Sequence, residues 1–386
     1  MATKQKKRKQ RPNRIVDKLI VTYTRRARHD IAQWQAALAL AENPERPRRW
    51  MLYNIYRDIL LDPHLTAEIQ KRTLAVTGAS YRLIDKNGKD SDRTELLQRE
   101  WFDKLLQWIL EARFWGHSLI QIDTLHAGEI DRLELVDRRH VVPEQGLFLP
   151  NMFDDKAIQY RDPKYYRWLI EVGEYRDLGL LNKAVPHVLF KRFAQSAWSE
   201  FTEIFGMPIR IAKTNTNDTE ALNRLEQMMV NMSTAFYAVI DYDEAIEFIE
   251  TAKTDGAVYD KLIDRSNSEI SKLISGAVLG ERSPGGSRAK EQVGKNISDQ
   301  ITAADRRWIG RVMNHYVLPK LIRLGYPFQG LRFAFDVEPD INQLWEITSG
   351  VLNHYDVDPE FIRTTFGIPV TGKKEQQLGI PDDFFD

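Results

Sequence analysis

The chain has 386 residues, of which 42% are hydrophobic and 28% are charged, so it can bury a substantial core in two or three structural regions. Its 55 basic and 55 acidic residues cancel, which excludes the strongly basic character usual in proteins that hold duplex DNA tightly. It has no cysteine and no apolar run near the roughly 20 residues that cross a bilayer, which excludes disulfides, thiolate chemistry and a membrane partner.

Residues 1–49 are predicted to form a basic tail followed by a helix. The tail is a block of like charges that repel one another, so a solvated segment is favoured over a nucleic-acid contact. Residues 14–40 have a helical pattern, which Pro44 and Pro47 interrupt before the folded body starts near Trp50. The charged residues of the tail are Lys4, Lys6, Lys7, Arg8, Lys9 and Arg11.

Residues 50–187 have the mixed pattern of an α+β region. Asp62 and Pro63 fit the start of a helix, because an aspartate side chain accepts a free backbone N–H and proline has none to lose. Residues 81–85 alternate toward an Asn-Gly pair that suits a tight hairpin turn. The elements expected after the turn are a helix over 96–115 and strands over 119–124 and 133–136.

Two long helices flank a small module in the middle of the chain. The first covers residues 188–205 and the second lies within 252–280, each with apolar side chains at helical spacing. Asn217 and Glu220 resemble a capping box that opens a short helix between predicted strands. The strands of the module are expected at 209–211, 236–240 and 245–249. The apolar faces include Phe190, Phe193, Trp198 and Phe201 on the first helix, and Leu262, Ile270 and Leu273 on the second.

A polar loop and a third long helix come next. Residues 281–290 contain a proline and two adjacent glycines, and they are too polar for a core. Residues 291–325 return to apolar residues at steps of three or four, which predicts a long helix. Two helices around a module, followed by a loop and another long helix, form an unusual order for a compact enzyme. The order suits a subunit of a ring.

The stretch from Phe190 to Lys213, FKRFAQSAWSEFTEIFGMPIRIAK, resembles the Mu-type family of portal proteins of tailed bacteriophages. Five further stretches resemble the same family in the expected order, so the resemblance covers about residues 50–372. These stretches are LLDPHLTAEIQKRTLAVTGASYRL at 60–83, AVIDYDEAIEFIE at 238–250, ISKLISGAVLGE at 270–281, GGSRAKEQV at 285–293 and FIRTTFGIPVTG at 361–372.

The resemblance implies the α+β portal fold, with a division of the chain into named regions. It assigns 50–187 to the wing, 188–205 and 252–280 to two stem helices, and 206–251 to an α/β clip. It assigns 281–290 to a tunnel loop, 291–325 to a long helix that returns to the wing, and 326–386 to a C-terminal remnant of wing and crown. Because little chain remains after Gly350, a short crown or none is expected.

The resemblance also implies partners and a location. A portal protein is expected to form a homo-oligomeric ring, a dodecamer in this family, at one vertex of the virion's capsid after assembly in the host cytoplasm. Double-stranded DNA would pass through the ring during packaging and ejection. The protein partners would be the terminase large subunit, the major capsid protein and a head-completion or adaptor protein. No catalytic residue, metal or cofactor is expected, because a separate motor would hydrolyse the ATP.

Two sets of residues would carry these contacts. The tunnel loop would face DNA with Arg282, Ser283, Pro284, Gly285, Gly286, Ser287, Arg288 and Lys290. The clip would dock partners with Met207, Pro208, Arg210, Lys213, Asn217, Asp218, Glu220 and Arg224. Exposed cations on a glycine-rich loop would guide DNA without gripping it, because each such pair contributes at most about 1 kcal/mol.

Two patterns suggest chemistry but have plainer interpretations. Residues 367–374 nearly spell a phosphate-binding P-loop, but Lys374 occupies the place of the Ser or Thr that binds magnesium. Asp241, Asp243 and Glu244 would suit a magnesium-dependent DNA-processing enzyme, although a solvated turn between strands is favoured. The eight histidines show no zinc-ligand spacing. A head-completion or scaffolding protein that never contacts DNA is a third interpretation.

Overall fold

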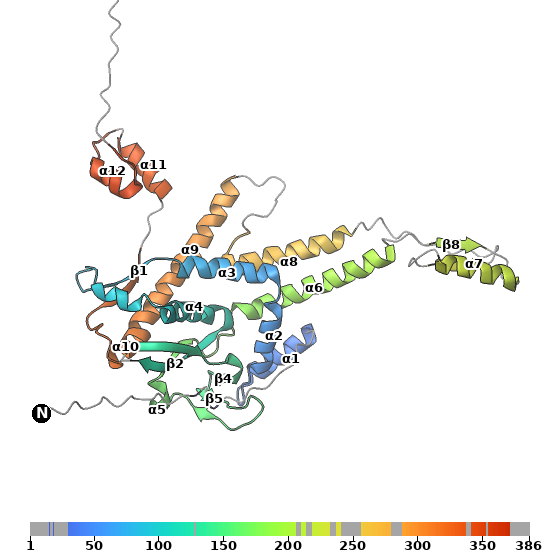
Figure 1. Ribbon diagram of the computed structural model, residues 1–386, viewed down its shortest axis with the longest axis horizontal. Coiled ribbons are helices and arrows are strands. Elements are labelled where there is room, and N and C mark those ends of the chain that lie inside the picture. Colours follow the sequence, from blue (N-terminus) through green and yellow to red (C-terminus); the bar gives the residue numbers. More distant parts are fainter. Residues whose placement is uncertain are drawn as a thin grey trace, which may run out of the picture. The chain divides into compact units, whose positions relative to one another are not determined.

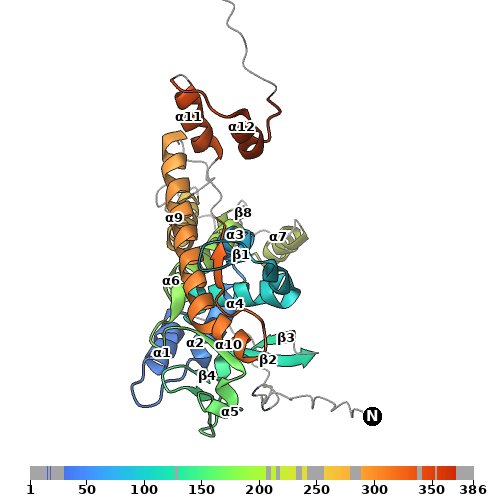
Figure 2. The same ribbon diagram turned by 90° about the vertical axis from the view of Figure 1, so that its left-hand side faces the viewer.

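The computed structural model forms two compact units, Met1–Phe335 and Asp336–Asp386, and each is described by itself. Figures 1 and 2 show the first unit from two sides. The structure describes residues 15, 18, 30–126, 129–205, 210–213, 218–231, 237–240, 256–278, 288–336, 341–352 and 354–370.

The body of the first unit is built from helices packed on a three-stranded antiparallel sheet, which confirms the α+β class. The sheet has the order β3-β2-β7, so β2 (His117–His126) lies between β3 (Glu129–Leu135) and β7 (Leu169–Gly173). A smaller sheet consists of β4 (Val141–Val142), β5 (Leu147–Phe148) and β6 (Ile158–Gln159). The helices before the long pair are α1 (Ile31–Ala41), α2 (Trp50–Ile59), α3 (Pro63–Thr77), α4 (Glu100–Trp115) and α5 (Pro163–Tyr166).

Helix α3 begins as predicted. The Asp62 carboxylate accepts the backbone N–H of Leu65 at 2.9 Å, and Pro63 occupies the first turn. The prediction of one helix over 14–40 is wrong, because Asp30 is extended and caps a helix that starts only at Ile31. Helix α2 was not predicted as a helix, although its buried residues recur at helical spacing.

Helix α4 is the centre of the main core. The helix packs against α3, α6 (Gly179–Phe205) and the sheet, and Phe102, Leu105 and Ile109 are fully buried in the core that these elements share. The helix ends at Gly116, whose φ is +86° and where an added Cβ would lie 2.1 Å from a backbone oxygen of Asp177. Only glycine fits this sharp turn from helix to strand.

The strand over 81–84 forms as predicted, but its partner is distant in sequence. Asn87 and Gly88 lie in the turn after β1 (Tyr81–Ile84). The segment after the turn returns only to a single isolated bridge between Asp90 and Ile84, so the hairpin does not extend further. Instead β1 pairs antiparallel with β10 (Arg332–Phe335). The rings of Tyr81 and Phe333 lie 5.6 Å apart within this pair, so packing selects the partner.

Helices α6 and α8 form an antiparallel pair that leaves the body (Figure 1). Helix α6 spans Gly179–Phe205, so it starts nine residues before the predicted 188. The turns of α6 before residue 188 belong to the core of the body, because Leu181 and Val185 are fully buried. Helix α8 spans Ala257–Ser275, within the predicted range.

The long helix predicted after the polar loop is present, in three parts. Helix α9 (Arg288–Val312) continues through a π-helical turn, Met313–Val317, into α10 (Leu318–Arg323). Pro319 has no N–H to donate to the preceding turn, and the wider π turn accommodates it.

A small βαβ module lies between α6 and α8 in the sequence. Strands β8 (Arg210–Lys213) and β9 (Tyr237–Ile240) are parallel and are joined through α7 (Thr219–Asn231). The side chain that caps α7 is that of Asp218, which accepts the N–H groups of Glu220 and Ala221. The capping box that we predicted at Asn217 is therefore displaced by one residue. The strand predicted at 245–249 lies outside the described residues.

Within its described residues, the second unit contains two helices, α11 (Ile341–Leu352) and α12 (Pro359–Phe366). The rings of Trp345 and Phe366 meet edge to face at 5.2 Å between centroids. Helix α12 ends at Gly367, which has a φ of +66° and donates its N–H to Arg363 at 3.1 Å. The first glycine of the apparent P-loop is thus a helix C-cap.

Candidate assembly surface on helices α6 and α8

The base of α6 is fixed to the body by two ion pairs. Lys191 Nζ lies 2.8 Å from the carboxylate of Asp62, and both side chains are about 5% exposed or less. Arg192 binds the Asp58 carboxylate at 2.5 Å and the Asp58 carbonyl oxygen at 2.6 Å. Because Asp58 and Asp62 flank the junction of α2 and α3, these contacts fix where α6 leaves the body.

The base of α8 is held against α3 by polar contacts that repeat once per helical turn. His64 Nε2 lies 2.8 Å from the Ser271 hydroxyl, and one turn further along both helices the Ser275 hydroxyl donates to the Glu68 carboxylate. These donors and acceptors are spaced by four residues on each helix, which places them along one line of contact.

Arg72 adds the next contact of this line and connects it to α9. Its guanidinium donates to the carbonyl oxygen of Ile274 at 2.6 Å and to the Asp305 carboxylate at 2.7 Å. Asp305 is 3% exposed, so the pair is shielded from water. Helices α3, α8 and α9 therefore meet at the largely shielded guanidinium of Arg72.

Two large apolar side chains of the α6 base face solvent. Phe190 is 49% exposed and Phe193 is 73% exposed, although their neighbours Leu189, Lys191 and Ala194 are buried. Adjacent exposed aromatic rings are the kind of surface that proteins cover with a partner. We call Phe190 and Phe193 the α6 aromatic face.

The far half of the pair is held by fewer contacts. The rings of Phe201 and Tyr259 lie 6.0 Å apart, and the Trp198 ring packs over the backbone at Gly256. Trp198 is still 37% exposed and Leu262 39%. Beyond the body, each helix thus has only the other to cover it within the described residues.

The predicted stem residues differ in burial. Phe190, Phe193, Trp198 and Leu262 are exposed in the single chain, and Phe201 is half-buried with its ring beside that of Tyr259. Ile270 is fully buried in the chain's own core and Leu273 packs against that core, so the expectation that both apolar stripes face other copies is wrong for this part of α8.

The predicted clip and loop residues are only partly described. Arg210 and Lys213 are on β8, whereas Glu220 and Arg224 are exposed on α7. The N-terminal turn of α9 contains Arg288 and Lys290. The remaining predicted residues lie outside the described ranges: Met207, Pro208, Asn217, Arg282, Ser283, Pro284, Gly285, Gly286 and Ser287.

Sequence reasoning missed the residues that fix the helix pair. Lys191 and Arg192 were read only as part of the resemblance, and Asp58 was not considered. A usable signal was present, because two adjacent cations inside an apolar helix require buried carboxylates as partners. The serines of α8 gave no such signal.

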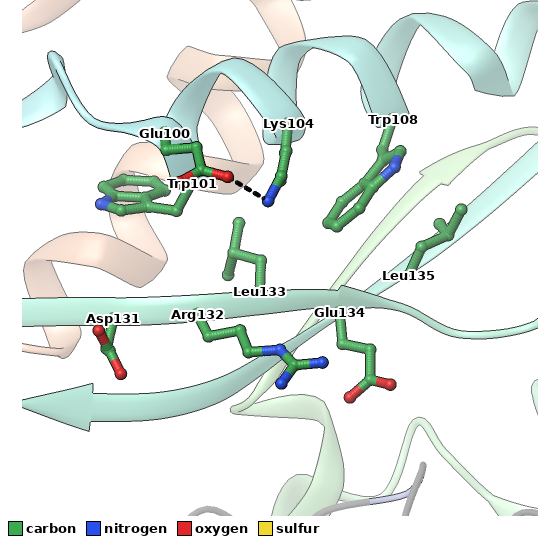
Figure 3. Close-up of a pocket in the computed structure, with 9 residues that line it drawn as sticks. All are labelled: Glu100, Trp101, Lys104, Trp108, Asp131, Arg132, Leu133, Glu134 and Leu135. Carbon is green, nitrogen blue, oxygen red and sulfur yellow. Dashed lines mark hydrogen bonds and ion pairs between the residues drawn. The ribbon is translucent and has the colours of Figure 1, made fainter.

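One groove of the body is lined by aromatic and charged side chains. It has a volume of about 650 Å³ and lies between α4 and β3, where Trp101 and Trp108 face Leu133 (Figure 3). Lys104 at its rim is paired with Glu100 at 2.6 Å. Its lining includes no histidine, serine or threonine that would serve as a nucleophile or base.

The described part of the chain has neither a cluster of metal ligands nor a membrane-spanning helix. Within the described ranges, no three histidine, aspartate or glutamate side chains are grouped to hold a metal ion. None of the described helices combines the length and hydropathy needed to cross a membrane. The carboxylates Asp241, Asp243 and Glu244 lie outside the described residues.

Comparisons with known proteins agree with one another. A family model described as the portal protein of Mu bacteriophage matches residues 53–368. The portal protein of Escherichia phage Mu is 23% identical over 285 residues, which cover 68% of this chain and 55% of that protein. The Mu-like prophage FluMu protein gp29 of Haemophilus influenzae is 21% identical over 349 residues, 82% of this chain and 66% of that protein. The chain thus spans between half and two thirds of the length of these curated relatives.

A solved structure is also similar. It is the HK97-family phage portal protein from Corynebacterium diphtheriae, with a TM-score of 0.42 and 12% sequence identity. The match covers 78% of this chain and 97% of that one.

Proposed function

Because the chain belongs to the family of Mu-type bacteriophage portal proteins, we propose that it is the subunit of a ring at one capsid vertex, a conduit for double-stranded DNA. Portal proteins of phages are components of the virion. The DNA would pass through the ring during packaging and again during ejection, and twelve copies would close the ring.

The observation that carries the proposal is the helix pair. Helix α6 is fixed at its base by ion pairs with Asp62 and Asp58, and α8 is fixed by hydrogen bonds to α3, yet the α6 aromatic face remains exposed in the single chain. A rigid base with an unpartnered apolar side is what a closed ring requires, because each copy presents the same surface at a constant angle. We therefore assign α6 and α8 as the stem helices and the α+β body as the wing.

The βαβ module between the helices is assigned as the clip. Glu220 and Arg224 are exposed on α7, so they are available to a protein partner. The terminase large subunit and later a head-completion protein would dock there, while the wing would contact the major capsid protein.

The tunnel loop is assigned to residues 281–290, between α8 and α9. Its cations would touch passing phosphates one at a time, and a separate motor would hydrolyse ATP. We expect no magnesium-dependent nuclease activity in the pure protein. Such an activity, if lost when Asp241, Asp243 and Glu244 are all replaced by Ala, would instead support a DNA-processing enzyme.

Negative-stain electron microscopy of the purified protein tests the ring. We expect closed rings with twelve-fold symmetry and an axial hole wide enough for duplex DNA. The double variant Phe190→Ser, Phe193→Ser should leave mostly single subunits, whereas the control Tyr175→Ser, which removes a 53% exposed aromatic elsewhere, should form rings. Wild-type particles without an axial hole would contradict the proposal.

A further inference from the structure

A second surface of the body concentrates positive charge, although the whole chain carries no net charge. It surrounds α5, and part of it is a groove of about 500 Å³ between α5 and α10. We call it the α5 basic patch, and its cations are Lys18, Arg161, Lys164, Arg167, Lys320 and Arg323.

Aromatic rings and carbonyl oxygens hold these cations in place. The ammonium groups of Lys18 and Lys164 lie 4.9 and 4.8 Å from the centroid of the same Tyr165 ring. Lys320 Nζ lies 3.7 Å from the centroid of the Tyr166 ring and donates to the carbonyl oxygens of Tyr166 and Leu169. Such contacts orient an ammonium group without neutralising its charge.

Carboxylates do not balance the patch. Glu171 is already bound by Arg161 at 2.7 Å and by the Tyr160 hydroxyl, and Asp162 is the other acidic residue of this segment. Among the described residues, neither Arg167 nor Arg323 has an ion pair with a carboxylate within 4.0 Å. Burial and, second, the charge of Arg323 lower the pKa of Lys320 to about 8. An anion in the groove would relieve this repulsion.

The basic N-terminal tail is tethered to the same part of the body. The backbone N–H of Ile15 donates to Gln121 Oε1 at 2.6 Å, and the Ile15 side chain is fully buried in the small cluster that contains Tyr165. The six cations between Lys4 and Arg11 precede this anchor by only a few residues in the sequence. The sequence therefore places six further cations a short distance along the chain from a residue that is anchored in this cluster.

We propose that the α5 basic patch binds the phosphate backbone of duplex DNA, as a contact separate from the pore. Two forked guanidinium groups without carboxylate partners suit phosphate oxygens, and the ring-held lysines supply fixed positive charge beside them. No patch residue belongs to the segments assigned to stem, clip or tunnel loop. The inference rests on the proposed function only in the choice of duplex DNA as the polyanion.

Covalently closed circular DNA separates this contact from threading, because a circle has no end to enter a pore. We would measure its binding to the full chain by gel shift at several salt concentrations. The variant Arg167→Gln, Arg323→Gln is compared with Lys86→Gln, Lys89→Gln, which removes two exposed cations far from the patch in sequence. Each lost phosphate contact lowers the slope of log K against log salt by about 0.9, so the patch variant should lose about 2 in slope and the control none.

The same titration can overturn the inference. Equal slopes for the patch variant and the wild type would refute it, as would an equal loss in the control. Binding of polyglutamate at the patch without binding of DNA would identify a docking site for an acidic protein and would also refute it. If the double variant folds poorly, the single variant Arg167→Gln, at an exposed position, can be measured in its place. It should show half of the slope change.

The test is independent of the ring. Patch-dependent binding of circular DNA by a protein that forms no rings would refute the proposed function and support this inference. Rings with an axial hole but without patch-dependent binding of circular DNA would support the proposed function and refute this inference.

Discussion

The two halves of the α6 and α8 pair differ in how they are held. At the base, Lys191 and Arg192 form ion pairs with Asp62 and Asp58, and serines of α8 bond to α3. In the far half, ring contacts such as Phe201 with Tyr259 replace the polar ones, and most side chains are exposed.

This difference shows what each half contributes. Polar contacts in a buried site act at short range and with fixed geometry, so the base sets the direction of both helices. Apolar contacts tolerate many geometries, and those of the far half cover only part of the apolar surface. The base is thus complete within one chain, whereas the exposed apolar faces stay uncovered in it.

The largest effect on stability is expected at the base. Lys191→Met leaves the Asp62 carboxylate buried without its cation, which should lower the free energy of unfolding by about 3–5 kcal/mol. Urea denaturation measures this. The double variant Lys191→Met, Asp62→Asn should recover part of the loss, because asparagine still caps α3 and carries no charge. A loss below 1 kcal/mol would show that the pair does not anchor α6.

The contact between α3 and α8 should give the next largest effect. Ser275→Ala removes the hydroxyl that donates to the buried Glu68 carboxylate, and we expect a loss of about 1.5–3 kcal/mol. Lys261→Ala, at an exposed position of the same helix, is the control and should cost less than about 0.5 kcal/mol. Equal losses for the two variants would mean that the α3 contact adds nothing specific.

Acid should weaken the body through the Glu171 carboxylate. Burial opposes ionisation of Glu171, but hydrogen bonds from His117, Arg161 and Tyr160 outweigh it and lower the pKa of Glu171 to about 2. Since this is below the ordinary value of 4.5, the stabilisation is present above pH 4.5 and is lost as pH falls toward 2. In Glu171→Gln, the fall in the free energy of unfolding between pH 4.5 and pH 2 should therefore be smaller than in the wild type, by about 1–2 kcal/mol.

Titrating the free energy of unfolding of both proteins from pH 5 to pH 2.5 measures this difference. Parallel curves for Glu171→Gln and the wild type would contradict the assignment.

The smallest effect on the single chain is expected on the α6 aromatic face. Phe193→Ser should change subunit stability by no more than about 0.5 kcal/mol, because a side chain that is 73% exposed loses little burial. Urea denaturation at a concentration where only single subunits are present measures it. A loss of 2 kcal/mol or more would place Phe193 in the subunit's own core.

Elements with a local signal were predictable from the sequence. Asp62 and Pro63 mark the start of α3 through capping chemistry, and the apolar spacing of residues 256–278 and 291–325 identifies α8 and the long helix after it. These features depend only on residues within one or two turns. The resemblance to portal proteins also came from short stretches of this kind.

Elements that depend on distant residues were not predictable. Nothing near Tyr81 indicates that β1 pairs with β10, and nothing near Gly179 separates the buried turns of α6 from the exposed ones. The serines of α8 read as ordinary polar residues until Glu68 and His64 are placed opposite them. The ion pair of Lys191 with Asp62 likewise joins α6 to the start of α3, and the residues near either position do not indicate the other.

The accessibility of position 193 tests most directly whether the α6 aromatic face is covered by another copy. Because the chain has no cysteine, Phe193→Cys introduces a single thiol, and its rate of reaction with a maleimide can be measured in assembled particles and in single subunits. We predict a reaction at least tenfold slower in the particles, with equal rates in both fractions for Tyr175→Cys. Equal rates at position 193 in both fractions would show that this face is not the surface through which copies assemble.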